Sequence, residues 1–330
     1  MKKLYPLLFC NSKEELKNEK LTNSLNNDSI IANGFLKGNT IDEAIEAYLG
    51  NLLGDKTFEY YRGMLPFKTQ IIKGKRDGSI IISPSDDIAL SRWMELGKPR
   101  ALFITKAPKN GSLFIGFNKE LTAQELFEHF NNKGLHKVMN ECEPIEGELY
   151  YIEGNVPFSL GQGVEALEIA ANSSLQFDIL KFEDFSETLD FINREKYIPR
   201  YEIPKESNLI VESIQLTKPN QLDPSELESL VALFVVKGKV EISSEYVKSS
   251  ELEDIKLASK DLILIPHDSN IITITPKTTE CELVRIHIKK IEAQLEESHT
   301  HDCEHHHCDE EHHHCDDHHC HDDEKHSMYN

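Results

Sequence analysis

The segment from His299 to His326 holds most of the side chains that could do chemistry in this chain. It contains twelve of the sixteen histidines and four of the seven cysteines. Imidazole and thiolate are ligands that Zn²⁺, Ni²⁺ and copper ions prefer, and interspersed carboxylates add attraction for a cation. The sequence therefore predicts a site for zinc or another transition metal. The predicted ligands are His299, His301, Cys303, His305, His306, His307, Cys308, His312, His313, His314, Cys315, His318, His319, Cys320, His321 and His326.

Cysteine and acid residues between the histidines distinguish this segment from a purification tag, which is a plain histidine run. The hexapeptide Glu-His-His-His-Cys-Asp occurs at residues 304–309 and again at 311–316. At four ligands per tetrahedral ion, the segment could hold about four ions. The cysteines are not spaced as the CxxC pairs of a zinc finger, so we expect an adaptable site suited to buffering, sensing or handover. The alternative is a solvated acidic tail with incidental metal affinity.

Composition and charge limit what the rest of the chain can be. The chain has 330 residues, of which 39% are hydrophobic, enough for one large or two medium domains with real cores. The formal net charge is −21, and the residues from 293 onward contribute −11 of it. The body is therefore mildly acidic and has no basic stripe. This balance argues against nucleic acid and against an anionic membrane as partners.

The body carries only Cys10, Cys142 and Cys281, too few for a disulfide framework. Thiolate metal ligands also require a reducing compartment, and no run of eighteen apolar residues is present to span a membrane. Residues 4–9 are apolar but too short for a signal peptide, so we interpret them as a first strand. A cytoplasmic protein is the expectation.

The sequence of the body predicts a few helices among many short strands. Residues 40–49 and 122–130 each begin at a Thr, carry acids in the first turn and repeat apolar residues at helical spacing. Residues 182–195 also look helical and would link two β units. Segments rich in β-branched residues and bounded by turn residues indicate a sandwich or barrel. They are residues 69–72, 79–82, 101–105, 112–117, 148–152, 164–169, 209–216, 230–236, 239–242, 261–265, 271–275 and 282–289.

An ordered set of phrases resembles the class I mannose-6-phosphate isomerases, which are cupin-type, zinc-dependent aldose–ketose isomerases. Residues 31–40 (IANGFLKGNT) are similar to the family's V-A-N-G-x-L-x-G-K-T, and residues 96–99 (LGKP) to its L-G-K-T/P-E. Residues 4–7, 65–68, 83–87, 148–163 and 240–266 match further phrases in the same order. The likeness extends over roughly residues 4–290. It implies a metal-dependent isomerase fold for the body.

The resemblance also implies where the family's metal ligands should be, and this chain departs from them. The family uses Gln, His, Glu and His, whereas the matching positions hold Ile81, Ser83, Arg100 and Phe158. Two of these are hydrocarbon, one is a cation, and a neutral hydroxyl is a poor ligand for Zn²⁺. Where the family has an Arg that assists the chemistry, this chain has Asp178. We therefore expect no metal in the first barrel.

Other candidate site residues in the body are few. Gln70, Glu153 and Gln162 are the near substitutes for the missing ligands. Lys98 and Arg100 could hold a phosphate, because a guanidinium binds it in a bidentate manner. The basic segment 73–78 lacks the P-loop pattern and is better explained as a hairpin turn. The body histidines are interpreted as surface, loop or strand residues, and they are His129, His136, His267 and His287.

The predicted architecture is mainly β: two cupin (jelly-roll) β-barrels with a small helical insertion, plus a disordered C-terminal tail. Residues 1–200 would form the first, isomerase-like cupin with the insertion near 120–140, residues 201–292 the second cupin, and residues 293–330 the tail. The functional hypothesis is a catalytically silent isomerase relative whose tail binds transition metals. The alternatives are an active mannose-6-phosphate isomerase that uses tail-borne metal, and a regulatory subunit of an active isomerase paralogue. A sugar phosphate is a further candidate ligand.

Overall fold

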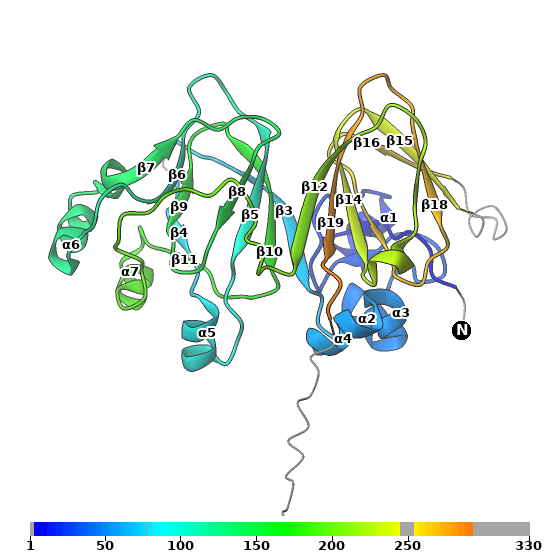
Figure 1. Ribbon diagram of the computed structural model, residues 1–330, viewed down its shortest axis with the longest axis horizontal. Helices are drawn as coiled ribbons and strands as arrows, with labels where there is room; N and C mark the ends of the chain where they lie inside the picture. The colour runs from blue at the N-terminus through cyan, green and yellow to red at the C-terminus, as the bar shows by residue number, and fades with distance from the viewer. Residues whose placement is uncertain (1–2, 77, 245–253, 293–330) are drawn as a thin grey trace, which may run out of the picture. The chain divides into compact units, whose positions relative to one another are not determined.

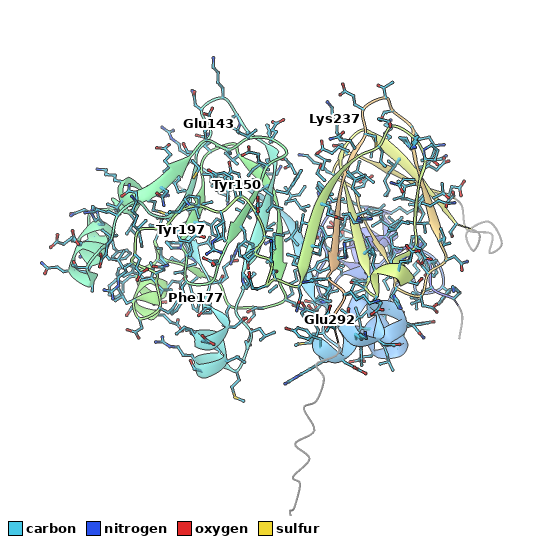
Figure 2. The ribbon with its side chains drawn as sticks, viewed as in Figure 1. Glu143, Tyr150, Phe177, Tyr197, Lys237 and Glu292 are labelled. Carbon is cyan, nitrogen blue, oxygen red and sulfur yellow. The ribbon has the colours of Figure 1, made fainter. Side chains whose placement is uncertain are left out.

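The computed structural model describes residues 3–76, 78–244 and 254–292, and the chain up to Glu292 forms one compact unit (Figure 1). Glu292, the last described residue, is labelled in Figure 2. Antiparallel strand makes up the larger part of the described secondary structure, and the strands form two barrels in chain order. The predicted disordered tail, residues 293–330, lies outside the described residues.

The first barrel consists of two antiparallel sheets that face each other. Tyr150 and Phe177 mark these two sheets in Figure 2. The first sheet has the order β3-β10-β5-β8 and the second the order β11-β4-β9-β6-β7. The strands of the first sheet are β3 (Phe67–Lys73), β10 (Glu165–Ala171), β5 (Arg100–Lys106) and β8 (Leu149–Ile152). Those of the second are β11 (Phe177–Asp178), β4 (Ile81–Ile82), β9 (Phe158–Leu160), β6 (Leu113–Phe117) and β7 (Met139–Cys142).

The second barrel repeats this arrangement with two four-stranded sheets, ordered β12-β19-β14-β17 and β13-β18-β15-β16. Non-sequential neighbours in both barrels are typical of a jelly roll. The predicted fold class, mainly β with two cupin barrels, is confirmed for the described residues. The strands are β12 (Leu209–Gln215), β19 (Glu282–Ile288), β14 (Val231–Lys237), β17 (Leu262–Ile265), β13 (Asn220–Leu222), β18 (Ile272–Pro276), β15 (Lys239–Ser244) and β16 (Ile255–Ala258).

The two predicted Thr-capped helices are confirmed. They are α2 (Ile41–Tyr48) and α6 (Ala123–Asn131), and each begins with a capping box, in which the Thr hydroxyl and a Glu carboxylate exchange hydrogen bonds with backbone N–H groups. The 3₁₀ helix η1 (Leu135–Val138) completes the predicted insertion near 120–140. The predicted helix over 182–195 is shorter, because α7 (Phe182–Thr188) ends before a run that includes residues of low helix propensity.

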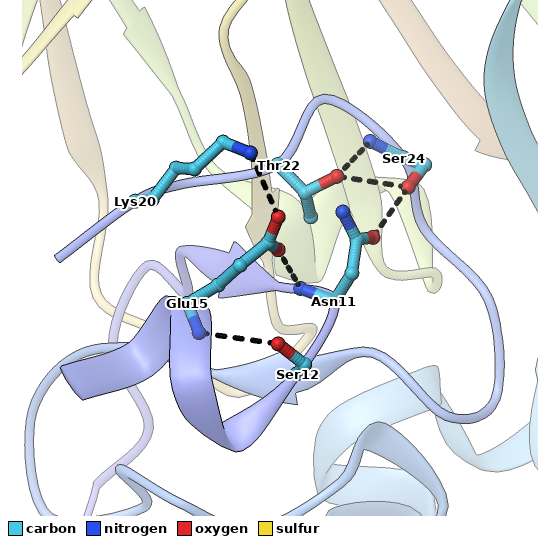
Figure 3. Close-up of polar contacts among 6 residues, drawn as sticks. All are labelled: Asn11, Ser12, Glu15, Lys20, Thr22 and Ser24. Atoms are coloured by element: carbon cyan, nitrogen blue, oxygen red, sulfur yellow. Dashed lines mark hydrogen bonds and ion pairs between the residues drawn. The ribbon is translucent and has the colours of Figure 1, made fainter. Parts of the chain in front are cut away.

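In the described part of the chain, four short α-helices and one 3₁₀ helix were not predicted: α1 (Lys13–Lys17), α3 (Gly50–Leu53), α4 (Asp55–Tyr60), α5 (Asp86–Trp93) and η2 (Pro224–Leu227). Local polar contacts hold α1 (Figure 3). The Ser12 hydroxyl accepts the Glu15 N–H, and the Glu15 carboxylate accepts from the Asn11 N–H and the Lys20 ammonium. Such self-contained contacts stabilise a helix of one turn without an apolar stripe, which is why hydrophobic periodicity did not reveal it.

The N-terminal segment contacts the second barrel. Residues 4–9 do not form the predicted continuous strand, since Pro6 lacks the N–H that a ladder requires. The segment β1 (Phe9–Cys10) pairs with β2 (Ile30–Ile31), and Leu4 and Leu7 form isolated bridges with Ser269 and Leu264 of the second barrel. The predicted division into residues 1–200 and 201–292 stays a prediction, and these contacts show that the first residues do not serve the first barrel alone.

Alternation along the central strands decides which side chains point into the first barrel. On β5, Ala101 and Phe103 pack in a core shared with the N-terminal segment and the second barrel, whereas Leu102 and Ile104 pack inside the first barrel. On β10, Leu167 and Ile169 likewise face the shared core. Because the side chains of a strand alternate between its faces, Arg100 and Glu168 point into the first barrel.

The interior of the second barrel is hydrocarbon. Its core includes Val231, Leu233, Ile263 and Leu283, together with other aliphatic residues and the thiol of Cys281. The clustered side chains of this core are uncharged, whereas the interior of the first barrel holds the buried charged residues Arg100 and Glu168. Among the described residues, none of the helices has the length and apolar character needed to cross a bilayer.

Candidate functional site

The four positions that the resemblance assigns to metal ligands lie together inside the first barrel. Ile81 on β4 and Phe158 on β9 are cross-strand partners. The Arg100 guanidinium carbon lies 4.9 Å from the centre of the Phe158 ring, and its Nη2 donates a hydrogen bond to the Ser83 hydroxyl. The positions thus occupy one place in the fold, as ligands of a single ion would. What they surround is a guanidinium group.

Arg100 is buried and its terminal nitrogens are engaged. Only 2% of its side chain is exposed, and only 4% of that of Glu168. Arg100 Nη1 donates to Glu168 Oε1 at 2.5 Å and to Gln176 Oε1 at 3.1 Å. A buried charge persists only when it is paired and hydrogen-bonded, and this pair meets both conditions.

The strand register explains why these groups meet. Glu168 on β10 lies directly opposite Gln70 on β3, and Gln70 Nε2 donates to Glu168 Oε2 at 2.5 Å. On the other side of β10, Arg100 is opposite Ala170, two residues from Glu168. Diagonal neighbours on one face of a sheet are within reach of a long side chain. Both carboxylate oxygens of Glu168 therefore accept hydrogen bonds.

The charges in this cluster shift one another. Burial raises the pKa of Glu168, but the Arg100 charge and the hydrogen bond from Gln70 oppose it, and the net pKa lies below its usual range. Burial lowers the pKa of Arg100, and Glu168 acts in the opposite direction. The cluster is a neutralised ion pair at pH 7, because both groups are ionised there. Burial and the nearby Arg100 lower the pKa of Lys98 to about 8.

The residues present do not fit the zinc ion that the resemblance implies. The side-chain oxygens of Ser83, Glu168 and Gln176 accept hydrogen bonds from the guanidinium, and the other two assigned positions are hydrocarbon. A Zn²⁺ ion needs imidazole, thiolate or carboxylate ligands, which its four assigned positions lack. Within residues 3–76, 78–244 and 254–292, no group of three or more His, Cys, Asp or Glu side chains could hold a metal ion.

The near substitutes are committed elsewhere. Gln70 bonds Glu168, as above. Glu153 pairs with Arg200 at 3.2 Å, and Gln162 is exposed in the turn between β9 and β10. The three side chains have separate surroundings in the described part of the chain, so they do not rebuild the missing ligand set.

Lys98 and Arg100, the predicted phosphate-binding residues, lie on either side of Gln176. The Lys98 ammonium donates to Gln176 Oε1 at 3.3 Å, the same oxygen that accepts from Arg100. A cavity of about 180 Å³ is lined by Arg100, and a second cavity of about 360 Å³ by Lys98. Lys98 is only half-buried and could reach a ligand, whereas the terminal nitrogens of Arg100 already have partners. Their role in binding a phosphate stays a prediction.

Asp178, which stands where the family has an Arg, does not line either of these cavities. Its carboxylate accepts the N–H of Leu180 and so serves the turn before α7. The residues of this cluster that sequence reasoning missed are Glu168 and Gln176. One signal could have found Glu168: a carboxylate in the middle of an otherwise apolar strand needs a buried partner of opposite charge.

The body histidines do not converge. His136 shares a hydrogen bond of 3.1 Å with the Ser159 hydroxyl, and His267 lies in the turn after β17. His287 on β19 is buried, with its Nε2 3.8 Å from Glu212. His129 is in the last turn of α6. The sixteen predicted metal ligands of the tail lie outside the described residues, and that prediction is untested by the structure.

Comparison with known proteins gives relatives by sequence and by fold. No family model matches the chain. It is 25% identical over 185 residues to mannose-6-phosphate isomerase ManA of Bacillus subtilis, which is 54% of this chain and 56% of the relative. It is 22% identical over 158 residues to mannose-6-phosphate isomerase of Streptococcus mutans, 48% of each chain. The matched region thus spans about half the length of these curated relatives.

Solved structures agree over a longer range. The mannose 6-phosphate isomerase of Bacillus subtilis superposes with a TM-score of 0.67 at 18% identity and covers 86% of this chain and 100% of that one. A putative mannosephosphate isomerase from Archaeoglobus fulgidus also gives 0.67, at 17% identity, over 79% of this chain and 83% of that one. The apo enzyme of Salmonella typhimurium gives 0.65 at 14% identity, over 88% and 100%. The chain is thus homologous to mannose-6-phosphate isomerases and has their cupin fold.

Proposed function

We propose that this chain is a catalytically silent relative of mannose-6-phosphate isomerase that binds transition-metal ions through its C-terminal tail. The observation that carries the first half is the buried Arg100–Glu168 pair. It occupies the place where the resemblance puts the zinc ligands. The second half rests on the His and Cys content of residues 299–326.

The chemistry of aldose–ketose isomerisation explains why this exchange matters. The reaction moves a proton between adjacent carbons through an enediolate, whose developing oxyanion needs strong electrostatic stabilisation. A metal ion supplies that stabilisation as a Lewis acid. The Arg100 guanidinium cannot substitute, since Glu168 neutralises its charge and hydrogen bonds occupy both of its terminal nitrogens. The first barrel thus has the fold of the isomerases but lacks the ligands for the metal ion that would act as the electrophile.

The chain truncated after Glu292 is expected to show no interconversion of mannose 6-phosphate and fructose 6-phosphate, with or without added Zn²⁺. A coupled assay that follows either product measures this, with the Bacillus subtilis enzyme as the active reference. Turnover well above the uncatalysed rate in the truncated chain would contradict the proposal. Turnover only in the full-length chain would favour the alternative, an isomerase whose metal ligands come from the tail.

A residual sugar-phosphate pocket is tested through Lys98 rather than Arg100, because loss of a buried charge could unfold the barrel. Mannose 6-phosphate should raise the melting temperature more than mannose does, and Lys98→Ala should abolish the difference. Lys106→Ala, at the exposed end of β5, is the matched control. The pKa of Lys98 is about 8, so the effect should fade as pH rises above that value and the ammonium loses its charge. A shift that is unchanged in Lys98→Ala would refute this assignment.

A further inference from the structure

A larger cavity, of about 630 Å³, lies between the basic turn after β3 and the helical insertion. This volume is within the range of sites for small molecules. The cavity is lined by residues of the β3–β4 turn, of β6 and β9, and of the segment from the end of α6 to η1. Ser159 and Lys75 line both this cavity and the small one at Arg100, so the two adjoin.

Positive charge gathers at the rim of this cavity. Lys75, Arg76 and Lys133 are exposed side chains among its lining residues, and the described lining residues include no Asp or Glu. No ion pair within the described part of the chain involves any of the three cations. Asp77 lies outside the described residues. In a body of net charge −10, three cations without a described acid at one cavity favour an anionic ligand.

The body of the cavity is apolar and partly aromatic. Phe114 and Phe130 are half-buried, and Leu180 is 40% exposed. One face of the Phe130 ring stacks on Phe185, with centroids 3.9 Å apart and planes at 4°. This stack holds the Phe130 ring in one orientation. Exposed ring and aliphatic surface of this kind favours a flat apolar group, which stacks without directional hydrogen bonds.

One neutral polar pair lies in the cavity wall. His136 Nε2 is 3.1 Å from the Ser159 hydroxyl, and the imidazole meets the Phe114 ring edge to face, with centroids 4.9 Å apart. Burial lowers the pKa of His136, so the imidazole is neutral at pH 7. This pair can donate or accept a hydrogen bond from a heteroatom of a ligand ring without adding charge.

We propose that this cavity binds an aromatic organic phosphate, of which a nucleoside monophosphate is the type. The ring lies against Phe114 and Phe130, and Lys75, Arg76 and Lys133 hold the phosphate. A guanidinium together with ammonium groups binds a phosphate dianion better than it binds a single carboxylate. A sugar phosphate that carries no aromatic group fits less well, because it has no flat apolar surface to place against Phe114 and Phe130. The proposal stands independently of the proposed function.

The test is calorimetric titration of the full-length chain with AMP, GMP, CMP, UMP and pyridoxal 5′-phosphate, in excess EDTA so that tail-bound metal does not contribute. At least one of these should bind at least about tenfold more tightly than the matching compound without phosphate, and than inorganic phosphate. The double variant Arg76→Ala/Lys133→Ala should weaken that binding by about tenfold or more, because charge-assisted hydrogen bonds are lost. Phe130→Leu should weaken the binding of the phosphate that carries an aromatic ring and leave the binding of inorganic phosphate unchanged.

Two matched controls keep the outcome specific. Lys137→Ala removes one positive charge from an exposed position of η1 that does not line the cavity, and should leave binding unchanged. Lys98→Ala tests the other pocket and should also have no effect. Binding of none of the five phosphates overturns the proposal. So does inorganic phosphate binding as tightly as the best of them, or mannose 6-phosphate binding more tightly than any of them with its binding lost in Arg76→Ala/Lys133→Ala.

Discussion

Replacing Arg100 by methionine is expected to lower the free energy of unfolding by about 3–5 kcal/mol, because it leaves the Glu168 carboxylate buried without its cation. Only 4% of the Glu168 side chain is exposed, so water cannot replace the lost partner. Glu168→Leu should be comparably destabilising, since it leaves the guanidinium unpaired. Denaturant unfolding of the chain truncated after Glu292 measures both.

The double variant Arg100→Met/Glu168→Leu distinguishes pairing from packing. A buried ion pair replaced by apolar residues of similar volume is often neutral or stabilising. We therefore expect the double variant to be more stable than either single variant, with a coupling energy of several kcal/mol. Arg285→Met is the matched control, because Arg285 makes a similar pair with Glu212 on partly exposed strands of the second barrel. That change should cost less than about 1 kcal/mol. Additive single effects at Arg100 and Glu168 would show that the pair is not coupled.

The Arg100–Glu168 pair should also make the stability of the fold decrease at acid pH. The pKa of Glu168 is lowered in the folded chain, so its contribution to stability is present above the ordinary glutamate pKa of about 4.3. That contribution is lost as pH falls below this value and passes through the lowered folded pKa. Stability of the parent chain should therefore fall more steeply between about pH 4.5 and pH 2 than that of the double variant. Identical pH profiles for the two chains would contradict the ion-pair description.

Local signals predicted the parts of the fold that rest on local physics. The Thr40 and Thr122 capping boxes depend on residues three positions apart, so α2 and α6 could be read directly. In the second barrel, β-branched runs gave the positions of β12, β14, β15, β17, β18 and β19 within about two residues, whereas the short strands β13 and β16 were not predicted. The resemblance supplied the pairing of these strands as a cupin, which no local pattern contains.

The parts that were missed depend on contacts between distant residues. Helices α3 and α4 meet at Gly54, which has φ +91°, and a Cβ there would lie 2.2 Å from the Glu228 carbonyl oxygen of the second barrel. Only the folded chain shows that this glycine is required by a close approach. The partner of Arg100 was missed for the same reason. The motif showed what Arg100 replaces, but Glu168 is 68 residues away and becomes its neighbour only through the register of β5 and β10.

We expect the tail to bind all of the metal and the chain up to Glu292 to bind none. The full-length protein, loaded with Zn²⁺ and dialysed, is expected to hold about four ions, and the chain truncated after Glu292 about none. The sixteen His and Cys residues of the tail supply the predicted ligands, whereas the four assigned barrel positions cannot coordinate an ion. Elemental mass spectrometry and calorimetry measure the stoichiometry. Equal uptake by the two chains would overturn the tail assignment, and one tight ion in the truncated chain would place a metal in the body.

Metal uptake by the tail should depend on pH and on its four cysteines. Protons compete with metal for imidazole and thiolate, so uptake should weaken as pH falls below the ordinary histidine pKa of about 6.5. Replacing Cys303, Cys308, Cys315 and Cys320 by Ser together should weaken Zn²⁺ binding, because thiolate is a strong zinc ligand. Cys142→Ser is the matched control, since burial raises the pKa of the Cys142 thiol and keeps it protonated at pH 7. If the control variant lost as much metal as the tail variant, the ligands would lie in the barrel and the tail would be no more than a solvated acidic segment.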